Sequence, residues 1–199
     1  MLLAAVVGYL VGSLSFAVIV SKMMGLSDPR SYGSGNPGAT NVLRSGNKKA
    51  AALTLFLDAF KGWLPVFVAQ MMGANPSVVA LVGLGAFLGH LYPIFFRFQG
   101  GKGVATAAGV LLGFQPLLGL MVLAVWLLVA YVFRYSSLAA LVASLFAPMG
   151  YMLGMNGWWT LHGQVLLAII VMTCLLLWRH RDNIKRLLAG QEGKIGQKK

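Results

Sequence analysis

Cysteine, acidic residues and charge of either sign are all scarce in this sequence. Its single cysteine, Cys174, excludes an intrachain disulfide, and we expect it to be an inert packing residue because it lies inside an apolar run. Charged residues make up 10% of the chain, whereas a soluble domain carries about a quarter. Hydrophobic residues make up 58%, so the sequence predicts an integral membrane protein.

The acidic residues are few enough to limit the chemistry. The chain has four of them, Asp28, Asp58, Asp182 and Glu192, and they do not cluster. Enzymes that handle diphosphates through magnesium generally need several carboxylates, which disfavours a nucleotide–alcohol phosphotransferase or a prenyl transferase. We therefore expect no metal site and no cofactor. The chain also lacks the G-x-S-x-G motif and the H-x₄-D pair of acyltransferases that use thioester donors.

Long apolar runs occupy most of the chain. They cover about residues 2–21, 50–72, 77–96, 104–133, 138–155 and 163–178. The fourth run is the longest, and Gly113 and Pro116 within it can turn the chain, so the sequence permits six spans or seven. We expect a single transmembrane domain, residues 1–199.

The positions of the basic residues choose between these two counts, because Lys and Arg are enriched in cytoplasmic loops. With seven spans, all of them except Lys61 fall on one side, in the segments 22–49, 97–103, 134–137 and 179–199. The sequence therefore predicts an all-α integral membrane protein with seven transmembrane helices, a periplasmic N-terminus and a cytoplasmic C-terminus. Its short span, 104–112, must be buried by its neighbours.

The formal net charge of +12 does not indicate nucleic-acid binding. The basic residues stand at the ends of apolar runs instead of forming a separate basic domain. Such positions suit anionic lipid or an anionic substrate.

Glycines and two charged residues stand out inside the apolar runs. Asp58 and Lys61 lie three residues apart, and ionisable groups in a span are costly unless they are paired. Either they only neutralise each other or they support a site. Three glycine pairs have the GxxxG spacing typical of close helix packing: Gly8/Gly12, Gly109/Gly113 and Gly150/Gly154.

The first of three polar stretches is GSGNPGATNVLR, residues 33–44. It lies in a connection of about 27 residues, and long ordered loops tend to be functional. Its candidate donors are Ser34, Asn36, Thr40, Asn41 and Arg44, although ordinary turn chemistry would use the same residue types.

The second stretch is GGKGVAT, residues 100–106. Its three glycines, Gly100, Gly101 and Gly103, let the backbone approach a ligand, and Lys102 adds a positive charge. A helix that starts at Val104 would direct its first amides towards an anion. These features predict a phosphate site, with a flexible basic turn as the alternative. The pattern is not a Walker A motif.

The third stretch is RHRDNIKRLLAGQE, residues 179–192. His180 and Asn183 lie three residues apart and hence on one helical face. The neighbouring Arg181, Lys185 and Arg186 are typical anchors to anionic lipid.

Taken together, the three stretches resemble the three motifs of the bacterial acyl-phosphate:glycerol-3-phosphate acyltransferases, the PlsY family. SGNPGATNVLR, GGKGVAT and RHRDNIKRLLAGQE follow the family's order and spacing, and the resemblance covers essentially the whole chain. It implies an enzyme that transfers a fatty acyl group from acyl phosphate to the 1-hydroxyl of glycerol 3-phosphate, which yields lysophosphatidic acid and phosphate. The active site would face the cytoplasm from the bacterial inner membrane, and membrane lipid would be a further partner.

The resemblance also implies roles for individual residues. Catalytic residues would be Ser34, Arg44, Lys102, His180 and Asn183. Substrate-binding residues would be Asn36, Thr40, Asn41, Gly100, Gly101, Gly103 and Thr106. Glu192 would be the structural acid of the third motif, and we expect Asp58 and Lys61 to give further structural support.

This chemistry needs no nucleophilic side chain, because acyl phosphate is a mixed anhydride with a good leaving group. The site must bind two phosphates, align a hydroxyl with a carbonyl and stabilise an oxyanion. The general base is open between His180 and a substrate phosphate oxygen. We expect the arginines on either side of His180 to lower its pKa.

A transporter of an organic phosphate would be the alternative class. Against it, the chain shows no internal repeat, and its outer loops lack charge. The sequence does not determine the acyl-chain preference or the oligomeric state, for which a monomer is favoured.

Overall fold

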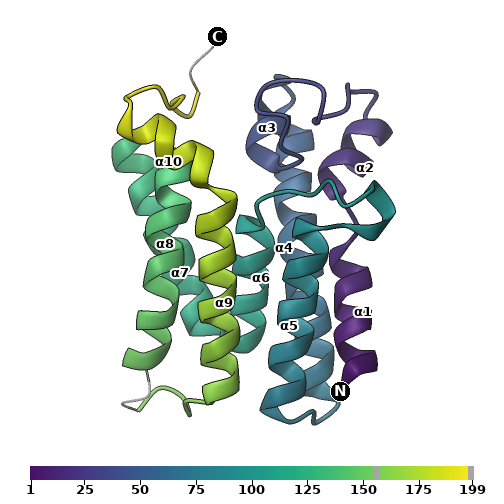
Figure 1. Cartoon of the computed structure of the whole chain (residues 1–199), viewed down its shortest axis with the longest axis vertical. Helices are drawn as coiled ribbons and strands as arrows, with labels where there is room; N and C mark the ends of the chain where they lie inside the picture. The colour runs from purple at the N-terminus through teal and green to yellow at the C-terminus, as the bar shows by residue number, and fades with distance from the viewer. Residues whose placement is uncertain (155–156, 197–199) are drawn as a thin grey trace.

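The computed structural model describes residues 1–154 and 157–196, and these residues form helices and loops without any strand. The helices run along one common direction and form an elongated bundle (Figure 1). Met1 lies at one end of this bundle and α10 lies at the other (Figure 1). In chain order the helices are α1 (Leu2–Gly12), α2 (Phe16–Met23), α3 (Ala39–Leu43), α4 (Lys48–Met71), α5 (Pro76–Leu91), the 3-10 turn η1 (Ile94–Phe96), α6 (Val104–Phe114), α7 (Pro116–Phe133), α8 (Ser136–Leu153), α9 (Gly163–Arg179) and α10 (Arg181–Leu188).

The helix lengths support a multi-pass membrane protein. Among the described residues, five segments are long and apolar enough to cross a membrane: 2–23, 48–71, 76–96, 116–133 and 136–153. The pair α9 and α10, bent by 57°, makes a sixth. Length alone therefore gives five or six spans, and the expected seven stay a prediction. Lys199, the expected cytoplasmic end, and residue 155, the end of the fifth apolar run, lie outside the described ranges.

The chain does break inside its longest apolar run, as Gly113 and Pro116 predicted. Gln115 has an extended backbone between α6 and α7, and Pro116 is the first residue of α7, where its missing N–H costs nothing. The resulting α6 has 11 residues and would measure about 16 Å, far less than a bilayer core of about 30 Å. Burial by neighbouring helices is what allows so short an apolar helix.

Glycines make that burial possible. A Cβ atom on Gly109 of α6 would overlap the carbonyl of Ala59 in α4, and one on Gly62 of α4 would overlap the carbonyl of Thr106 in α6. The two helices therefore touch backbone to backbone. The prediction of close packing at Gly109 is confirmed.

Helices α1 and α5 meet in the same way. A Cβ atom on Gly8 would lie 2.5 Å from the carbonyl oxygen of Val82, and one on Gly12 would overlap the carbonyl of Ala86. The third predicted pair differs, because it does not bring two helices together at Gly154. This residue packs on the ring of Trp159, which lies in the connection after the same helix, α8.

The first apolar run forms one candidate span, as the sequence predicted, but its helix is interrupted. It is broken at residues 13–15, between α1 and α2. A broken helix frees backbone carbonyls that must find partners inside a membrane. Here the Ser13 hydroxyl donates to the carbonyl of Tyr9 over 2.8 Å, and the Lys61 ammonium donates to the carbonyl of Leu14 over 2.6 Å.

The core and the outer surface divide as expected for a membrane bundle. A continuous apolar core joins α4 to α9, and a smaller cluster under α3 is formed by Ala17, Val20, Val42, Ala50 and Ala51. Large apolar side chains cover the outside, especially on α7, where Leu128 and Tyr131 are exposed. Cys174 faces outward too, so the expectation that it packs in the interior is wrong.

Candidate active site

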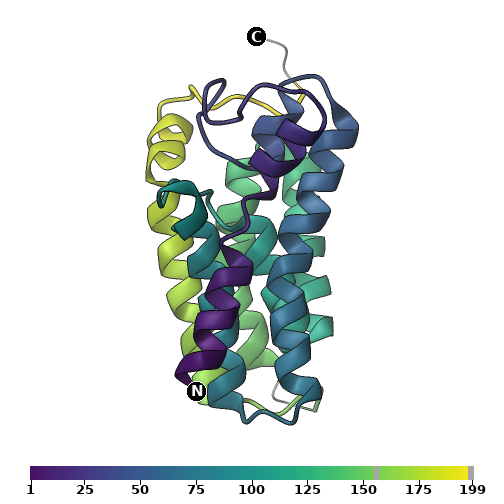
Figure 2. The same cartoon turned by 90° about the vertical axis from the view of Figure 1, so that its right-hand side faces the viewer.

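The three polar stretches lie towards the end of the bundle opposite Met1. Figures 1 and 2 show α3, with the loop around it, and α10 at that end, and the loop that contains η1 lies just below them. The stretches are far apart in sequence, so the helices between them bring them together.

Asn41 organises the first stretch. Its amide nitrogen donates to the carbonyls of Pro29 (2.6 Å) and Tyr32 (3.1 Å), and its amide oxygen accepts from the backbone N–H of Ser34 (3.0 Å). Asn41 is 2% exposed, and a Cβ atom on Gly33, whose φ is 61°, would overlap the Asn41 amide oxygen. Asn41 was predicted to bind substrate, but its polar atoms instead hold the loop in shape.

The loop that Asn41 shapes presents the other predicted residues of this stretch. Ser34, Thr40 and Arg44 are exposed, and Asn36 is half-buried. The Arg44 side chain passes beside Gly33, where a Cβ atom would lie 3.1 Å from Arg44 Cδ. These side chains remain accessible to a ligand.

The glycines of the second stretch pack against α5 and the first stretch. A Cβ atom on Gly100 would overlap the carbonyls of His90 and Leu91, and one on Gly101 would overlap the His90 ring and lie 3.0 Å from the carbonyl oxygen of Pro37. The N–H of Gly101 donates to the carbonyl of His90 over 3.1 Å. The Gly101 amide is therefore already paired in this structure, and a role for Gly101 in substrate binding stays a prediction.

Gly103 is also restricted by packing. Its φ is 86°, a conformation that favours glycine, and a Cβ atom there would overlap the side chain of Phe87 in α5. A Gly103→Ala substitution would therefore strain the loop itself, so it is a poor probe of ligand contact.

Arg179 ties the second stretch to α9. Its guanidinium donates to the carbonyl of Gly100 (2.9 Å) and twice to the carbonyl of Gly101 (3.0 and 3.2 Å). The guanidinium also lies over the ring of Tyr92, 5.7 Å from its centre. The sequence predicted only an effect of Arg179 on the pKa of His180, and the structure gives it a structural role as well.

Lys102 and Asn183 bring the second and third stretches into direct contact. The Lys102 ammonium donates to the Asn183 amide oxygen, and the Asn183 amide nitrogen donates to Glu192 over 2.6 Å. Glu192 also accepts from the hydroxyl of Ser137 in α8 (2.7 Å) and from the guanidinium of Arg186 (2.7 Å). Lys102 is thus held by a chain of hydrogen bonds that ends at a fixed carboxylate.

Charge and burial set the protonation states of Lys102 and Glu192. Burial lowers the pKa of Lys102 to about 8, and the nearby Arg186 acts in the same direction. Burial raises the pKa of Glu192, but hydrogen bonds from Ser137, Asn183 and Arg186 lower it to below its usual range. At neutral pH, Lys102 is therefore protonated and Glu192 is ionised.

His180 is buried at the bend between α9 and α10. Its Nδ1 lies 2.9 Å from the carbonyl of Leu176, which can only accept, so Nδ1 carries the proton and Nε2 is free to accept one. Burial is the main cause that lowers the pKa of His180 to about 4, with smaller contributions from Lys102 and Arg179. The predicted direction is confirmed, but the cause is mainly burial, and Arg181 is not part of it.

The first stretch approaches the other two without a hydrogen bond to their key side chains. Within residues 1–154 and 157–196, neither Ser34 nor Arg44 forms a hydrogen bond with Lys102 or His180, although the carbonyl of Pro37 lies close to Gly101. A substrate would have to bridge Ser34 and Arg44 to Lys102.

Two further sets of predicted residues lie inside the bundle. Asp58 and Lys61 form an ion pair of 2.7 Å, and both are 2% exposed. Thr106 is fully buried against Gly62, so it cannot reach a ligand at the surface and its predicted binding role is not supported.

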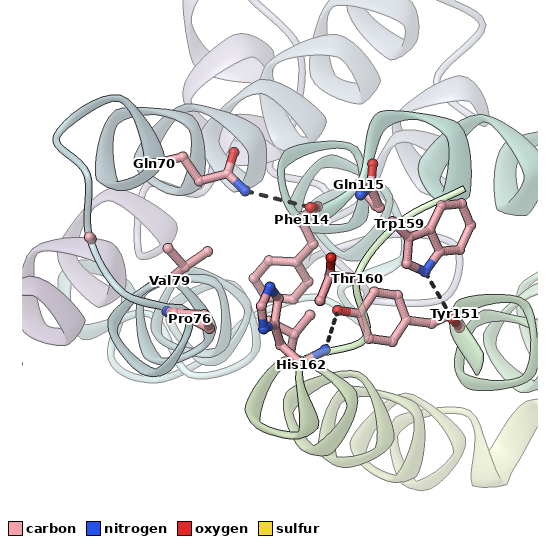
Figure 3. Close-up of a pocket in the computed structure, with 11 residues that line it drawn as sticks. Gln70, Pro76, Val79, Phe114, Gln115, Tyr151, Trp159, Thr160 and His162 are labelled. Carbon is pink, nitrogen blue, oxygen red and sulfur yellow. Dashed lines mark hydrogen bonds between the residues drawn. The ribbon is translucent and has the colours of Figure 1, made fainter. Parts of the chain in front are cut away.

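A separate cavity of about 340 Å³ opens at the opposite end of the bundle (Figure 3). Its wall contains Gln70, Gln115, Thr160 and His162 beside aromatic rings, and Trp159 donates to the carbonyl of Tyr151 over 2.9 Å (Figure 3). The described residues that line it include no Lys or Arg. It therefore lacks the positive charge of a phosphate site, in contrast to the end that holds Lys102.

The described part of the chain shows no group of three or more His, Cys, Asp or Glu side chains placed to hold a metal ion. Independence of metal stays a prediction that an activity measurement must test.

Sequence reasoning missed Ser137 and the structural roles of Arg179 and Arg186, and it ranked His90 only as a weak candidate. Ser137 had no local signal, because it is an ordinary residue near the start of a helix. His90 stood out as a histidine inside an apolar run, ten residues before Gly100, but nothing in the sequence connects it to Asp58.

Comparison with known proteins identifies the class. The family model described as glycerol-3-phosphate acyltransferase matches residues 2–190. A glycerol-3-phosphate acyltransferase of Burkholderia orbicola (strain MC0-3) is 64% identical over 200 residues, which cover 100% of this chain and 94% of that protein. Its counterpart in Burkholderia multivorans (strain ATCC 17616 / 249) is 61% identical, with 100% and 92% covered.

Solved structures agree with these relatives. The crystal structure of PlsY (YgiH), an integral membrane glycerol 3-phosphate acyltransferase, in its glycerol 3-phosphate form matches with a TM-score of 0.89 and 41% identity, over 98% of this chain and 95% of that one. Its lysophosphatidic acid form matches with a TM-score of 0.88 and 40% identity, over the same shares.

The fold and these relatives define an integral membrane acyltransferase. More narrowly, the chain belongs to the glycerol-3-phosphate acyltransferase family, within which it resembles PlsY. The transporter alternative is thereby set aside.

Proposed function

We propose that this enzyme transfers a fatty acyl group from acyl phosphate to the 1-hydroxyl of glycerol 3-phosphate and releases lysophosphatidic acid and inorganic phosphate. The observation that carries the proposal is the Lys102 ammonium, positioned by Asn183 and Glu192 at a positively charged end of the bundle. The related solved structures in glycerol 3-phosphate and lysophosphatidic acid forms support the substrate and the product.

The proposed reaction needs two phosphate sites and one aligned hydroxyl. Lys102 binds one phosphate group, and the exposed Arg44 and Ser34 of the first stretch bind the other, with Asn36 and Thr40 as further donors. The 1-hydroxyl oxygen attacks the acyl carbonyl carbon, the bond between that carbon and the phosphate oxygen breaks, and phosphate leaves. Donors aimed at the carbonyl oxygen stabilise the charge that develops there.

The proton of the attacking hydroxyl goes either to Nε2 of His180 or to a phosphate oxygen of a substrate. A general base works best when its pKa is near the working pH, and the pKa of His180 lies at about 4. This mismatch favours a substrate oxygen as the base and His180 as a residue that orients the glycerol backbone.

The proposed setting is the bacterial inner membrane, with seven spans, a periplasmic N-terminus and the active site towards the cytoplasm. The distribution of Lys and Arg supports this orientation. Glycerol 3-phosphate would then reach the site from the cytoplasm, and the acyl chain would lie among the apolar side chains that face the lipid. We propose that the enzyme acts as a monomer.

The test uses the purified full chain in lipid vesicles, with radiolabelled glycerol 3-phosphate and acyl phosphate in the presence of EDTA. We expect label in lysophosphatidic acid and release of one phosphate per acyl group. Uptake of label without conversion, or conversion only after magnesium is restored, would contradict the proposal.

A further inference from the structure

Three ionisable side chains meet deep inside the bundle, away from the proposed substrate contacts. We call Asp58, Lys61 and His90 the buried charge cluster. The Lys61 ammonium lies 2.7 Å from Asp58 Oδ1, and His90 Nδ1 lies 3.7 Å from the same oxygen. The three residues are 2%, 2% and 7% exposed. Such groups are costly inside a membrane, and a mutually satisfied pair would need no third member.

Lys61 connects the cluster to the break in the first apolar run. Its ammonium donates to the carbonyl of Leu14 over 2.6 Å and lies over the ring of Phe16, 5.6 Å from the centre. Leu14 stands in the break, and Phe16 begins α2, the helix that leads to the first polar stretch. Lys61 therefore fixes the direction in which the chain leaves the break.

His90 connects the cluster to the second polar stretch. It lies in the last turn of α5, where a helix leaves its carbonyls without partners, and its carbonyl accepts the N–H of Gly101 over 3.1 Å. The tip of its ring fills the space that a Cβ atom on Gly101 would need. Asp58 faces the other side of the ring, so the imidazole stands between a buried carboxylate and the loop that carries Lys102.

The contacts of Lys61 with Leu14 and Phe16, and those of His90 with Gly101, thus reach segments that lead to the candidate active site. We propose that Asp58, Lys61 and His90 are positioning residues. They fix the break after α1 and the second polar stretch, residues 100–106, against α4. In this way they hold Lys102 and the first stretch at the spacing that glycerol 3-phosphate requires. This inference rests on the proposed function for the identity of the substrate.

The test separates positioning from simple structural support by comparing KM with kcat. Removing one partner of a buried ion pair leaves an isolated charge, whereas replacing both is often neutral for stability. The informative variant is therefore the double substitution Asp58→Asn/Lys61→Met. We expect its KM for glycerol 3-phosphate to rise about tenfold while kcat and the KM for acyl phosphate change less than about threefold.

A second variant probes the His90 side without touching the ion pair. His90→Leu keeps the volume of the side chain but removes its polar ring, and His90→Gln restores a donor that can face Asp58. We expect His90→Leu to raise the KM for glycerol 3-phosphate and His90→Gln to recover most of the loss.

The matched control is Thr173→Val, which removes a buried hydrogen bond of 3.0 Å to the carbonyl of Ser144, between α9 and α8. Its KM should equal that of the parent chain. If His90→Leu and the folded double variant also keep the parent KM, the inference is wrong. If the parent chain itself converts no glycerol 3-phosphate, the proposed function fails instead, so the two failures are distinct.

Discussion

At the scale of single residues, protonation at the candidate site is set by burial more than by neighbouring charge. Burial is the largest cause of the lowered pKa of both Lys102 and His180. A lysine with a pKa of about 8 is charged at neutral pH but loses its proton within the range of an ordinary assay. A histidine with a pKa of about 4 stays neutral throughout that range.

Lys102 should therefore make the enzyme sensitive to alkaline pH. As the pH rises through about 8, the ammonium loses its proton and its attraction for phosphate, so kcat/KM for glycerol 3-phosphate should fall. Measuring kcat/KM from neutral pH to about pH 10 tests this, since the pH dependence of kcat/KM reports groups of the free enzyme.

The control for this pH dependence is Lys102→Arg, whose guanidinium stays protonated. Its kcat/KM should be lower at neutral pH because the guanidinium cannot repeat the geometry of the ammonium, but the decline above pH 8 should disappear. An unchanged alkaline decline in this variant would show that another group titrates.

His180→Asn separates the two roles left open for His180. An amide donates and accepts hydrogen bonds but cannot take a proton, so loss of a general base should lower kcat by roughly 10²–10⁴-fold. We expect instead a higher KM for glycerol 3-phosphate and a kcat within about tenfold of the parent, because an activated donor needs little help from a base. A large fall in kcat at unchanged KM would identify His180 as the base.

At the scale of helices, the short apolar helix α6 is held by a backbone contact with α4. Helix α6 is too short to span a bilayer by itself, and it starts directly after the loop that carries Lys102. Its backbone touches α4 at Gly109, and α4 also carries Asp58 and Lys61. The contact at Gly109 therefore places the start of α6 close to the buried charge cluster. The second polar stretch, which carries Lys102, is placed there with it.

Gly109→Ala should destabilise the protein, because the added Cβ atom would overlap the carbonyl of Ala59. Overpacking of this kind costs about 1–3 kcal/mol, which corresponds to a fall in Tm of several degrees for a chain of this size. Gly163→Ala is the control, since a Cβ atom at that exposed helical position meets nothing within 4 Å. Thermal unfolding of both variants in detergent gives the comparison, and equal Tm values would contradict the proposed contact.

At the scale of the whole molecule, the two ends of the bundle differ in charge. The end with α3 and α10 carries the polar stretches, and the opposite end carries the uncharged cavity beside Tyr151 and His162. An anionic substrate is therefore attracted to one end only, and the orientation of the bundle decides which compartment supplies it.

Cysteine labelling measures that orientation. In a Cys174→Ala background, which removes the exposed native thiol, we expect Thr160→Cys to react with an impermeant maleimide on intact spheroplasts and Gly193→Cys to react only after lysis. The two positions lie at opposite ends of the bundle and both are exposed. Labelling of both, or of Gly193→Cys alone, before lysis would overturn the proposed topology.

Much of this architecture follows from local sequence. The apolar runs predict membrane helices because each residue contributes its own transfer free energy. Gly113 and Pro116 predicted the break before α7, because backbone preference acts on neighbouring residues. The three polar stretches, and the family to which they belong, could likewise be recognised without a structure.

Only the tertiary structure decided how those parts serve one another. The break after Gly12 is stabilised by Lys61, the Gly101 amide is occupied by His90, and the Lys102 ammonium is directed by Asn183. Each of these contacts joins residues of different segments at no regular spacing, so no periodicity or motif along the chain reports it. The pKa of His180 belongs with them, because it depends on how deeply the folded bundle buries the imidazole.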